Sequence, residues 1–236
     1  MSQAGGTPRA PGGLIRLAVM ASGRGTNLAA ILAAVAAGRV AAQPVLVLSD
    51  NPAAPALDIA RAHGIPTFAV APRDAGGRAA FFRLVEAQLV DAGVDLVALA
   101  GFMRLLPAAL VQRFRWRILN IHPSLLPAFP GLDAPRQALE YGVRVSGCTV
   151  HFVDEGMDTG PIVLQAAVPV LPDDTVESLT ARIQKEEHRI YPEAIQLFAE
   201  GRLQVDGRRV RILSVPNAAR VPDAAGAPGP GALRQA

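Results

Sequence analysis

The chain has 236 residues, of which half are hydrophobic and 18% are charged, and its formal net charge is +3. That length is sufficient for one large α/β domain with a substantial core. No block of like charges occurs, so nucleic-acid binding is weakly supported, and no apolar run approaches the roughly 18 residues that cross a membrane. Cys148 is the single cysteine, which excludes an intramolecular disulfide and favours a reducing, cytoplasmic location.

Both ends of the chain are expected to be disordered tails, at residues 1–13 and 214–236. Each is rich in Ala, Gly and Pro and has too little apolar surface to offset the entropy of ordering. A single domain is therefore expected over residues 14–213.

The first half of this domain alternates between strand and helix patterns. The predicted strands are 14–21, 44–49, 67–70, 95–100 and 117–121, and the predicted helices are 27–37, 54–63, 77–92 and 107–114. The run at 95–100 is continuously apolar, as in a strand buried on both faces. This order predicts an α/β fold with a doubly wound, mostly parallel sheet.

The second half has a different pattern, in which antiparallel strands are added to the sheet. The predicted elements are a helix at 134–141, paired strands at 147–154 and 161–170, a long helix at 175–200, and a hairpin of 203–205 with 209–213. Thr175 is the expected N-cap of the long helix. The capping box is expected to be incomplete because Ser178 replaces Glu at the third helical position.

The first strand leads into a glycine-rich turn, Ser-Gly-Arg-Gly-Thr-Asn-Leu at 22–28. A dinucleotide fingerprint with Asp50 as its acidic residue is disfavoured, because Leu28 occupies the position that needs a small residue. No Gly-Lys-Ser/Thr follows, which excludes a Walker loop. A single phosphate bound by Gly25, Thr26 and Asn27 at the helix N-terminus fits better, and a purely structural turn stays open.

The fifth strand ends in Asn-Ile-His-Pro-Ser at 120–124. Side chains two residues apart in a strand share a face, so Asn120 and His122 should project together from a strand end, where open α/β sheets hold their sites. An amide beside an imidazole suits acyl transfer, in which it stabilises an oxyanion and moves a proton. The alternative is an asparagine in a turn and a locally bonded histidine. Ser124 lacks a nucleophile elbow, which disfavours a serine hydrolase.

Two charged segments follow, an acidic loop at 154–160 and the run 184–188 on the long helix. The loop is a solvated turn, or it supplies a carboxylate that holds His122 as imidazolium. The helical run is a solvent-facing charge pattern, or it offers a glutamate to a substrate ammonium. No metal is expected, because the four histidines lack zinc-ligand spacing and the acids lack the EF-hand pattern.

Together these segments resemble the folate-dependent formyltransferase family and, within it, the phosphoribosylglycinamide formyltransferases. Five segments carry the resemblance in family order: 22–28, Ala-Gly-Phe-Met-Arg-Leu-Leu at 100–106, 120–127 with Pro-Gly at 130–131, 154–160, and Glu-His-Arg-Ile-Tyr-Pro at 187–192. The resemblance implies a Rossmann-like formyltransferase fold, with a nucleotide-binding half at about 14–115 and a folate and catalytic half at about 116–213.

The resemblance also implies a reaction and its site. A formyl group would pass from the co-substrate 10-formyltetrahydrofolate to the amine of glycinamide ribonucleotide, with Asn120, His122 and Asp158 as the catalytic residues. The implied ribonucleotide site comprises Gly25, Thr26, Asn27, Gln184, Lys185, Glu186 and Glu187. The implied folate site comprises Arg78, Met103, Arg104, Leu105, Leu106, Asn120, Asp154, Glu155, Gly156, Met157 and Asp158. Glu187 would meet the substrate amine.

One segment departs from the family pattern. Residues 132–138 read Leu-Asp-Ala-Pro-Arg-Gln-Ala, without the two histidines that the family often has there. This departure leans toward methionyl-tRNA formyltransferase, although the C-terminal barrel of that relative is not expected here. A formyltetrahydrofolate hydrolase would need an N-terminal regulatory domain, for which no room is expected. A non-catalytic nucleotide-binding module is the third alternative, and the retained trio argues against it. The expected state is a monomer or weak homodimer without nucleic-acid or membrane partners.

Overall fold

The computed structural model describes residues 13–214, so the predicted tails lie outside the described residues except for Gly13 and Ser214. The described residues form one nine-stranded sheet in the order β3-β2-β1-β4-β5-β6-β7-β9-β8. The strands are β1 Ile15–Met20, β2 Ala42–Ser49, β3 Thr67–Ala69, β4 Leu96–Leu99, β5 Ile118–His122, β6 Val145–Phe152, β7 Ile162–Pro169, β8 Leu203–Asp206 and β9 Arg209–Ile212. The helices are α1 Thr26–Ala36, α2 Pro55–Ala62, α3 Arg78–Asp91, α4 Ala108–Arg113, α5 Ala134–Tyr141 and α6 Val176–Ala199.

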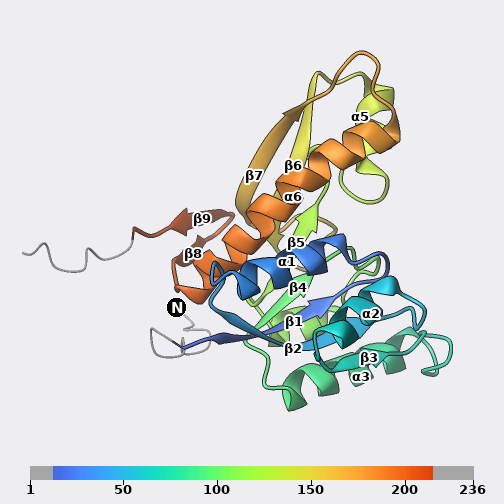
Figure 1. The fold of residues 1–236 in the computed structure, drawn as a ribbon, viewed down its shortest axis with the longest axis vertical. Coiled ribbons are helices and arrows are strands. Elements are labelled where there is room, and N and C mark those ends of the chain that lie inside the picture. The colour runs from blue at the N-terminus through green and yellow to red at the C-terminus, as the bar shows by residue number, and fades with distance from the viewer. Residues whose placement is uncertain (1–12, 215–236) are drawn as a thin grey trace, which may run out of the picture.

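The first five strands are parallel, and the central strands β1 and β4 are buried on both faces. In β1, Leu17 and Val19 belong to the core on one face, and Ala18 and Met20 belong to the core on the other. Helices α1, α2 and α6 contribute to the first core, and α3 and α4 contribute to the second. This two-sided burial explains the continuous apolar runs and confirms the predicted doubly wound sheet (Figure 1).

The antiparallel strands of the second half also form as predicted. β6 pairs antiparallel with β5 and β7, and β7 then pairs in parallel with β9 of the terminal hairpin. Figure 1 shows β6 and β7 projecting away from the parallel part of the sheet, together with α5 and the first half of α6. The cleft described below lies where this projecting part meets the parallel strands.

Helix α6 connects the two parts of the fold. Its buried Tyr191 shares its hydroxyl between the carbonyl oxygens of Leu99, at 3.0 Å, and Leu119, at 2.9 Å, which ties α6 to β4 and β5. Thr175 caps the helix as predicted. The expectation of an incomplete capping box is wrong, because Ser178 donates and accepts in the role that Glu or Gln usually fills.

None of the helices within residues 13–214 is long and apolar enough to span a membrane. The division into a single domain at 14–213 with two halves remains a prediction.

Candidate active site

A cleft of about 640 Å³ opens at the carboxyl ends of β1, β4 and β5. The chain order reverses beside β1, which lies between β2 and β4, and an open α/β sheet holds its ligands at such a point. The cleft is lined by residues 22–27, 99–106, 120–123 and 153–158, by a stripe of α6, by most of 131–136 and by His151. The fold therefore brings together the segments that the sequence singled out.

The loop after β1 wraps the N-terminus of α1. Gly25, the N-cap, has a φ of 78°, and a Cβ there would lie 2.8 Å from the Cα of Ala56. Only glycine fits a left-handed residue packed so closely against α2. Within residues 13–214 no side chain caps α1, so its first amide groups are available to an anion.

Helix α6 presents one stripe to the cleft, formed by Val176, Thr180, Ile183, Gln184 and Glu187. Glu187 is buried, and its Oε2 accepts a 2.9 Å hydrogen bond from Nδ2 of Asn27. Burial raises the pKa of Glu187, and the Asn27 hydrogen bond opposes that rise.

Lys185 and Glu186, which the resemblance assigns to the ribonucleotide site, are not among the residues that line the cleft, and their place in that site stays a prediction. A helix turns about 100° per residue, so neighbours of Gln184 and Glu187 point elsewhere. Lys185 is exposed, and Glu186 pairs with Arg189 at 2.7 Å. Val176 and Thr180 were missed, although their spacing of seven and three residues from Ile183 marks the same helical face.

The opposite wall carries the segment predicted to hold folate. Met103, Arg104, Leu105 and Leu106 all line the cleft, and Met103 and Leu105 are exposed. Arg78 is not in the lining, but its guanidinium donates a 2.9 Å hydrogen bond to the Leu105 carbonyl of this wall. Arg78 thus contacts the segment predicted to hold folate, and its own contact with folate stays a prediction.

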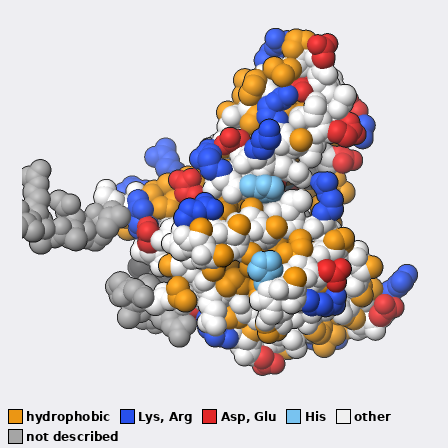
Figure 2. Space-filling model, viewed as in Figure 1, with side chains coloured by type: hydrophobic (Ala, Val, Ile, Leu, Met, Phe, Trp, Pro, Cys, Tyr) orange, Lys and Arg blue, Asp and Glu red, His pale blue; other side chains and the backbone are white. Residues whose placement is uncertain are grey.

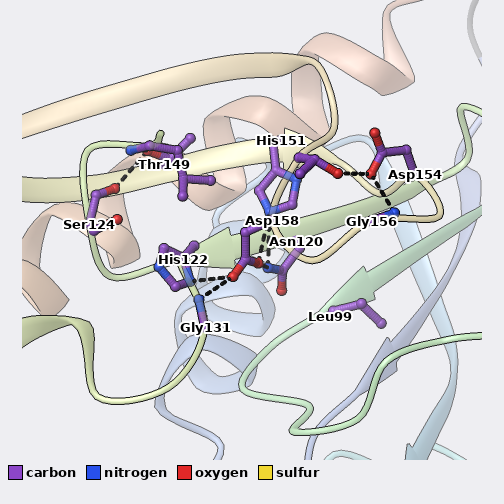
Figure 3. A network of polar contacts seen from close by, with 12 residues as sticks. Leu99, Asn120, His122, Ser124, Gly131, Thr149, His151, Asp154, Gly156 and Asp158 are labelled. Atoms are coloured by element: carbon purple, nitrogen blue, oxygen red, sulfur yellow. Dashed lines mark hydrogen bonds and ion pairs between the residues drawn. The ribbon is translucent and has the colours of Figure 1, made fainter. Parts of the chain in front are cut away.

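Asn120, His122 and Asp158 converge at the centre of the cleft, and Asp158 lies between the other two side chains (Figure 3). Asp158 Oδ2 is 3.4 Å from Nδ1 of His122, and its Oδ1 is 3.5 Å from Nδ2 of Asn120. The backbone N–H of Gly131 donates a 2.8 Å bond to Oδ2. Asp158 has a φ of 55°, a strained conformation for a non-glycine residue that is concentrated at functional sites.

His151 also belongs to this cluster and was not predicted. Its Nδ1 donates a 2.9 Å bond to the Phe152 carbonyl, so its Nε2 accepts a 3.1 Å bond from Nδ2 of Asn120. The same Nε2 is 3.6 Å from Asp158 Oδ1. His151 stands opposite Asn120 in the antiparallel pair of β5 and β6, a register that sequence patterns on either strand do not reveal.

His122 is held by its other nitrogen, since Nε2 donates a 2.8 Å hydrogen bond to the Phe129 carbonyl. Burial lowers the pKa of His122, and the Phe129 carbonyl and the Asp158 carboxylate act in the opposite sense. Asp158 thus acts on the pKa of His122 in the predicted direction, although burial has the larger effect, and the expectation that Asp158 keeps His122 charged stays a prediction. The neutral ring turns Nδ1 toward a carboxylate that would stabilise an arriving proton.

Asp158 itself is held as a carboxylate. Its pKa is lowered because burial, which raises it, is outweighed by the neighbouring His151 imidazole, by the hydrogen bond from the Gly131 N–H and by the His122 imidazole. The acidic loop is folded on itself: Asp154 accepts hydrogen bonds from the Gly156 N–H and the Thr159 hydroxyl. The loop is thus held by its own hydrogen bonds and is not a simple solvated turn.

The loop that departs from the family pattern also borders the cleft, through Gly131, Leu132, Asp133, Pro135 and Arg136. Across residues 13–214, no group of His, Cys, Asp and Glu side chains has the arrangement of a metal site.

The doubly wound sheet and the amide–imidazole–carboxylate cluster at its fifth strand define an α/β enzyme of the group-transfer class. Residues 15–195 match the family model described as formyl transferase. The chain belongs to the formyl transferase family.

Similar proteins agree with this assignment. The chain is 46% identical over 181 residues to a protein from Bacillus subtilis named phosphoribosylglycinamide formyltransferase, covering 77% of this chain and 93% of the relative. It is 48% identical over 188 residues to the trifunctional purine biosynthetic protein adenosine-3 of Drosophila melanogaster, which covers 79% of this chain but only 14% of that longer protein. A crystal structure of glycinamide ribonucleotide transformylase 1 from Symbiobacterium toebii superimposes with a TM-score of 0.84 at 57% identity, covering 86% and 96% of the two chains.

Proposed function

We propose that this enzyme transfers the formyl group of 10-formyltetrahydrofolate to the amine of 5'-phosphoribosylglycinamide in purine biosynthesis. The observation that carries the proposal is the meeting, in one cleft, of Asn120, His122 and Asp158 with an uncapped helix N-terminus and the buried carboxylate of Glu187. Relatives with this fold are named for the same transfer.

The ribonucleotide is proposed to bind between α1 and α6. Its phosphate suits the free amides at Gly25, Thr26 and Asn27, where the helix dipole favours a negative charge. The substrate amine suits Glu187, because a buried carboxylate with one hydrogen-bonded oxygen gains a partner when an ammonium arrives. Gln184 lies three residues before Glu187 on the same stripe of α6 and completes this subsite.

The folate is proposed to bind against the wall opposite α6. Large apolar side chains are exposed around that end of the cleft: Met103, Leu105, Leu132 and Met157. Such exposed apolar surface is unusual unless a ligand covers it, and a flat pteridine ring would do so. Arg104 and the 154–158 loop border the same region, and Arg78 is hydrogen-bonded to the Leu105 carbonyl there.

The formyl donor supplies an activated carbonyl carbon. The bound ammonium first loses one proton to solvent. The neutral amine then forms a new carbon–nitrogen bond to the formyl carbon, the bond to the folate nitrogen breaks, and one proton passes from the amine to the folate nitrogen. As negative charge develops on the formyl oxygen, Asn120 can turn one N–H from its weak 3.5 Å contact with Asp158 toward that oxygen. His122 Nδ1 receives the amine proton, Asp158 stabilises the imidazolium, and the same nitrogen returns the proton.

Methionyl-tRNA formylation is the rival transfer. On the face drawn in Figure 2, Lys and Arg side chains are scattered with Asp and Glu among them, which gives an RNA backbone no continuous basic surface. A non-catalytic module on this fold is disfavoured because all three reacting groups are present and in contact. A cytoplasmic location and a monomer or weak homodimer remain predictions.

The test is turnover with 10-formyltetrahydrofolate and 5'-phosphoribosylglycinamide, followed by the absorbance change of the folate. Asn120→Ala should lower kcat by about 10²–10³-fold, the usual effect of losing one oxyanion donor. Gln204→Ala, which removes an exposed amide in the distant hairpin, is the matched control. Wild-type turnover no higher than that of Asn120→Ala would reject the proposal, and activity on methionyl-tRNA alone would favour the rival.

A further inference from the structure

Asp50 lies behind the cleft and has no place in the chemistry described above. It follows β2, its side chain is only 7% exposed, and it does not belong to the lining of the cleft. In a dinucleotide-binding site, which the sequence disfavours, Asp50 would bind a ribose hydroxyl. Both of its oxygens are instead engaged within the protein.

The two oxygens of Asp50 reach two different walls of the cleft. Oδ1 accepts a 2.6 Å hydrogen bond from the hydroxyl of Ser22. Ser22 begins the loop 22–27, called here the phosphate loop because the ribonucleotide phosphate is proposed to bind there. Oδ2 accepts from Nε of Arg104, in the wall that carries Met103 and Leu105. One buried carboxylate therefore holds both segments, which lie 28 and 54 residues from it in the chain.

Ser22 also bonds directly to the segment 101–106, in addition to its bond with Asp50. Its hydroxyl oxygen also accepts a 3.0 Å hydrogen bond from the Met103 N–H, and its own N–H donates a 3.1 Å bond to the Gly101 carbonyl. The phosphate loop and the opposite wall are thus bonded to each other and to one anchor. Charge-assisted hydrogen bonds of this kind are strong and directional.

We infer that Asp50 is a positioning residue that fixes loop 22–27 relative to segment 101–106 and thereby sets the two substrate subsites at one spacing. The part about substrates rests on the proposed function. Loss of the Asp50 charge would free Arg104 and loosen Ser22, so both subsites would lose their preformed geometry. Loss of this preformed geometry should weaken the binding of both substrates. It should affect the chemical step little, because the reacting groups on β5 and the 154–158 loop stay in place.

The test compares Asp50→Asn with Asp58→Asn, which removes the same charge from an exposed acid on α2. Amide hydrogen exchange of the ligand-free proteins is read on peptides covering 22–27 and 101–106. Asp50→Asn should accelerate exchange in both peptides, and Asp58→Asn should accelerate neither. In steady-state kinetics Asp50→Asn should raise KM for both substrates about tenfold, the loss expected for one charge-assisted hydrogen bond, with kcat within about threefold of wild type.

Acceleration in one peptide only, or in neither, would overturn the inference, as would a fall in kcat with unchanged KM values. Ser22→Ala provides the second variant should Asp50→Asn fail to fold, because it cuts the same connection and leaves the Asp50–Arg104 pair intact. It should loosen both peptides to a smaller extent. A wild-type enzyme without turnover, combined with loosening of both peptides, would reject the proposed function and leave the positioning role of Asp50 standing.

Discussion

Asn27 and Glu187 lie 160 residues apart in the chain, and they meet through a 2.9 Å hydrogen bond inside the cleft. The two residues come from the first turn of α1 and the middle of α6, which pack against each other. Asn27 Oδ1 is buried and has no hydrogen-bond partner within the described part of the chain. Such an orphaned acceptor beside a buried carboxylate is costly to the fold and suits a site that waits for a cationic donor.

Replacing Glu187 with Gln should separate stability from function. Burial raises the pKa of Glu187, so in wild type the free energy of unfolding falls as pH rises above about 4.5, the ordinary glutamate value. Gln keeps an acceptor for Asn27 without that cost, and the variant should be at least as stable as wild type at pH 7.5. Its KM for the ribonucleotide should rise about 10–100-fold, because the substrate ammonium loses its charged partner.

Chemical denaturation across pH 4.5–8 and steady-state kinetics measure the two effects of Glu187→Gln. Glu193→Gln, at a half-exposed position of the same helix, is the control and should change neither. A Glu187→Gln protein that is less stable at pH 7.5 and binds the ribonucleotide normally would contradict the assignment.

Gly25 should tolerate no side chain. Gly25→Ala would place a Cβ 2.8 Å from Ala56 in a left-handed backbone conformation, which should cost about 1–3 kcal/mol and distort the phosphate loop. The melting temperature should fall, and the KM for the ribonucleotide should rise. Gly23→Ala lies in the same loop with nothing within 4 Å of the added Cβ, so its melting temperature should match wild type. Equal melting temperatures for the two variants would refute the packing argument.

Asp158→Asn should keep the fold and impair the chemistry. Asparagine tolerates the left-handed conformation at φ 55°, and its carbonyl can still accept from the Gly131 N–H. Without the carboxylate, the pKa of His122 should fall further below its ordinary value, because Asp158 opposes the effect of burial. We expect kcat to drop by about 10²-fold, the contribution typical of general acid–base catalysis.

NMR titration of the His122 ring in Asp158→Asn and wild type would measure this change in pKa directly. A rise in the pKa of His122 on loss of Asp158, or an unchanged kcat, would show that the carboxylate does not support the imidazolium.

His188 should make the protein less stable in mild acid. Burial lowers the pKa of His188, and its Nε2 has no hydrogen-bond partner among residues 13–214. The unfolded chain then binds the proton first, so the free energy of unfolding should fall as pH drops from about 6.5 through the lower folded value. Burial of His122 acts in the same sense.

His188→Gln should reduce the loss of stability between pH 7 and pH 5.5, measured by denaturation at a series of pH values. His63→Gln, at an exposed position, should keep the wild-type slope. An unchanged slope in His188→Gln would mean that proton uptake by this ring does not contribute.

Much of the site was predictable because its signals are local. The projection of Asn120 and His122 from one face of β5 follows from the two-residue period of a strand. The helix start at 25–27 follows from glycine and from the apolar periodicity of α1. The resemblance assigned the contiguous segment 184–187 to one site, and the structure places Gln184 and Glu187, but not Lys185 and Glu186, in the lining of the cleft, because a helix turns successive side chains to different sides.

By itself the sequence determined the alternation of strands and helices, the strand-end pair Asn120 and His122, and the glycine at the phosphate loop. These features depend on backbone conformation and on burial of adjacent residues, which neighbouring positions in the chain encode. Only the tertiary structure decided that Asp158 lies between His122 and His151, that Glu187 meets Asn27, and that Asp50 holds two walls of one cleft. Those contacts join segments far apart in the chain, and their geometry is set by strand register and by packing of α6 across the sheet.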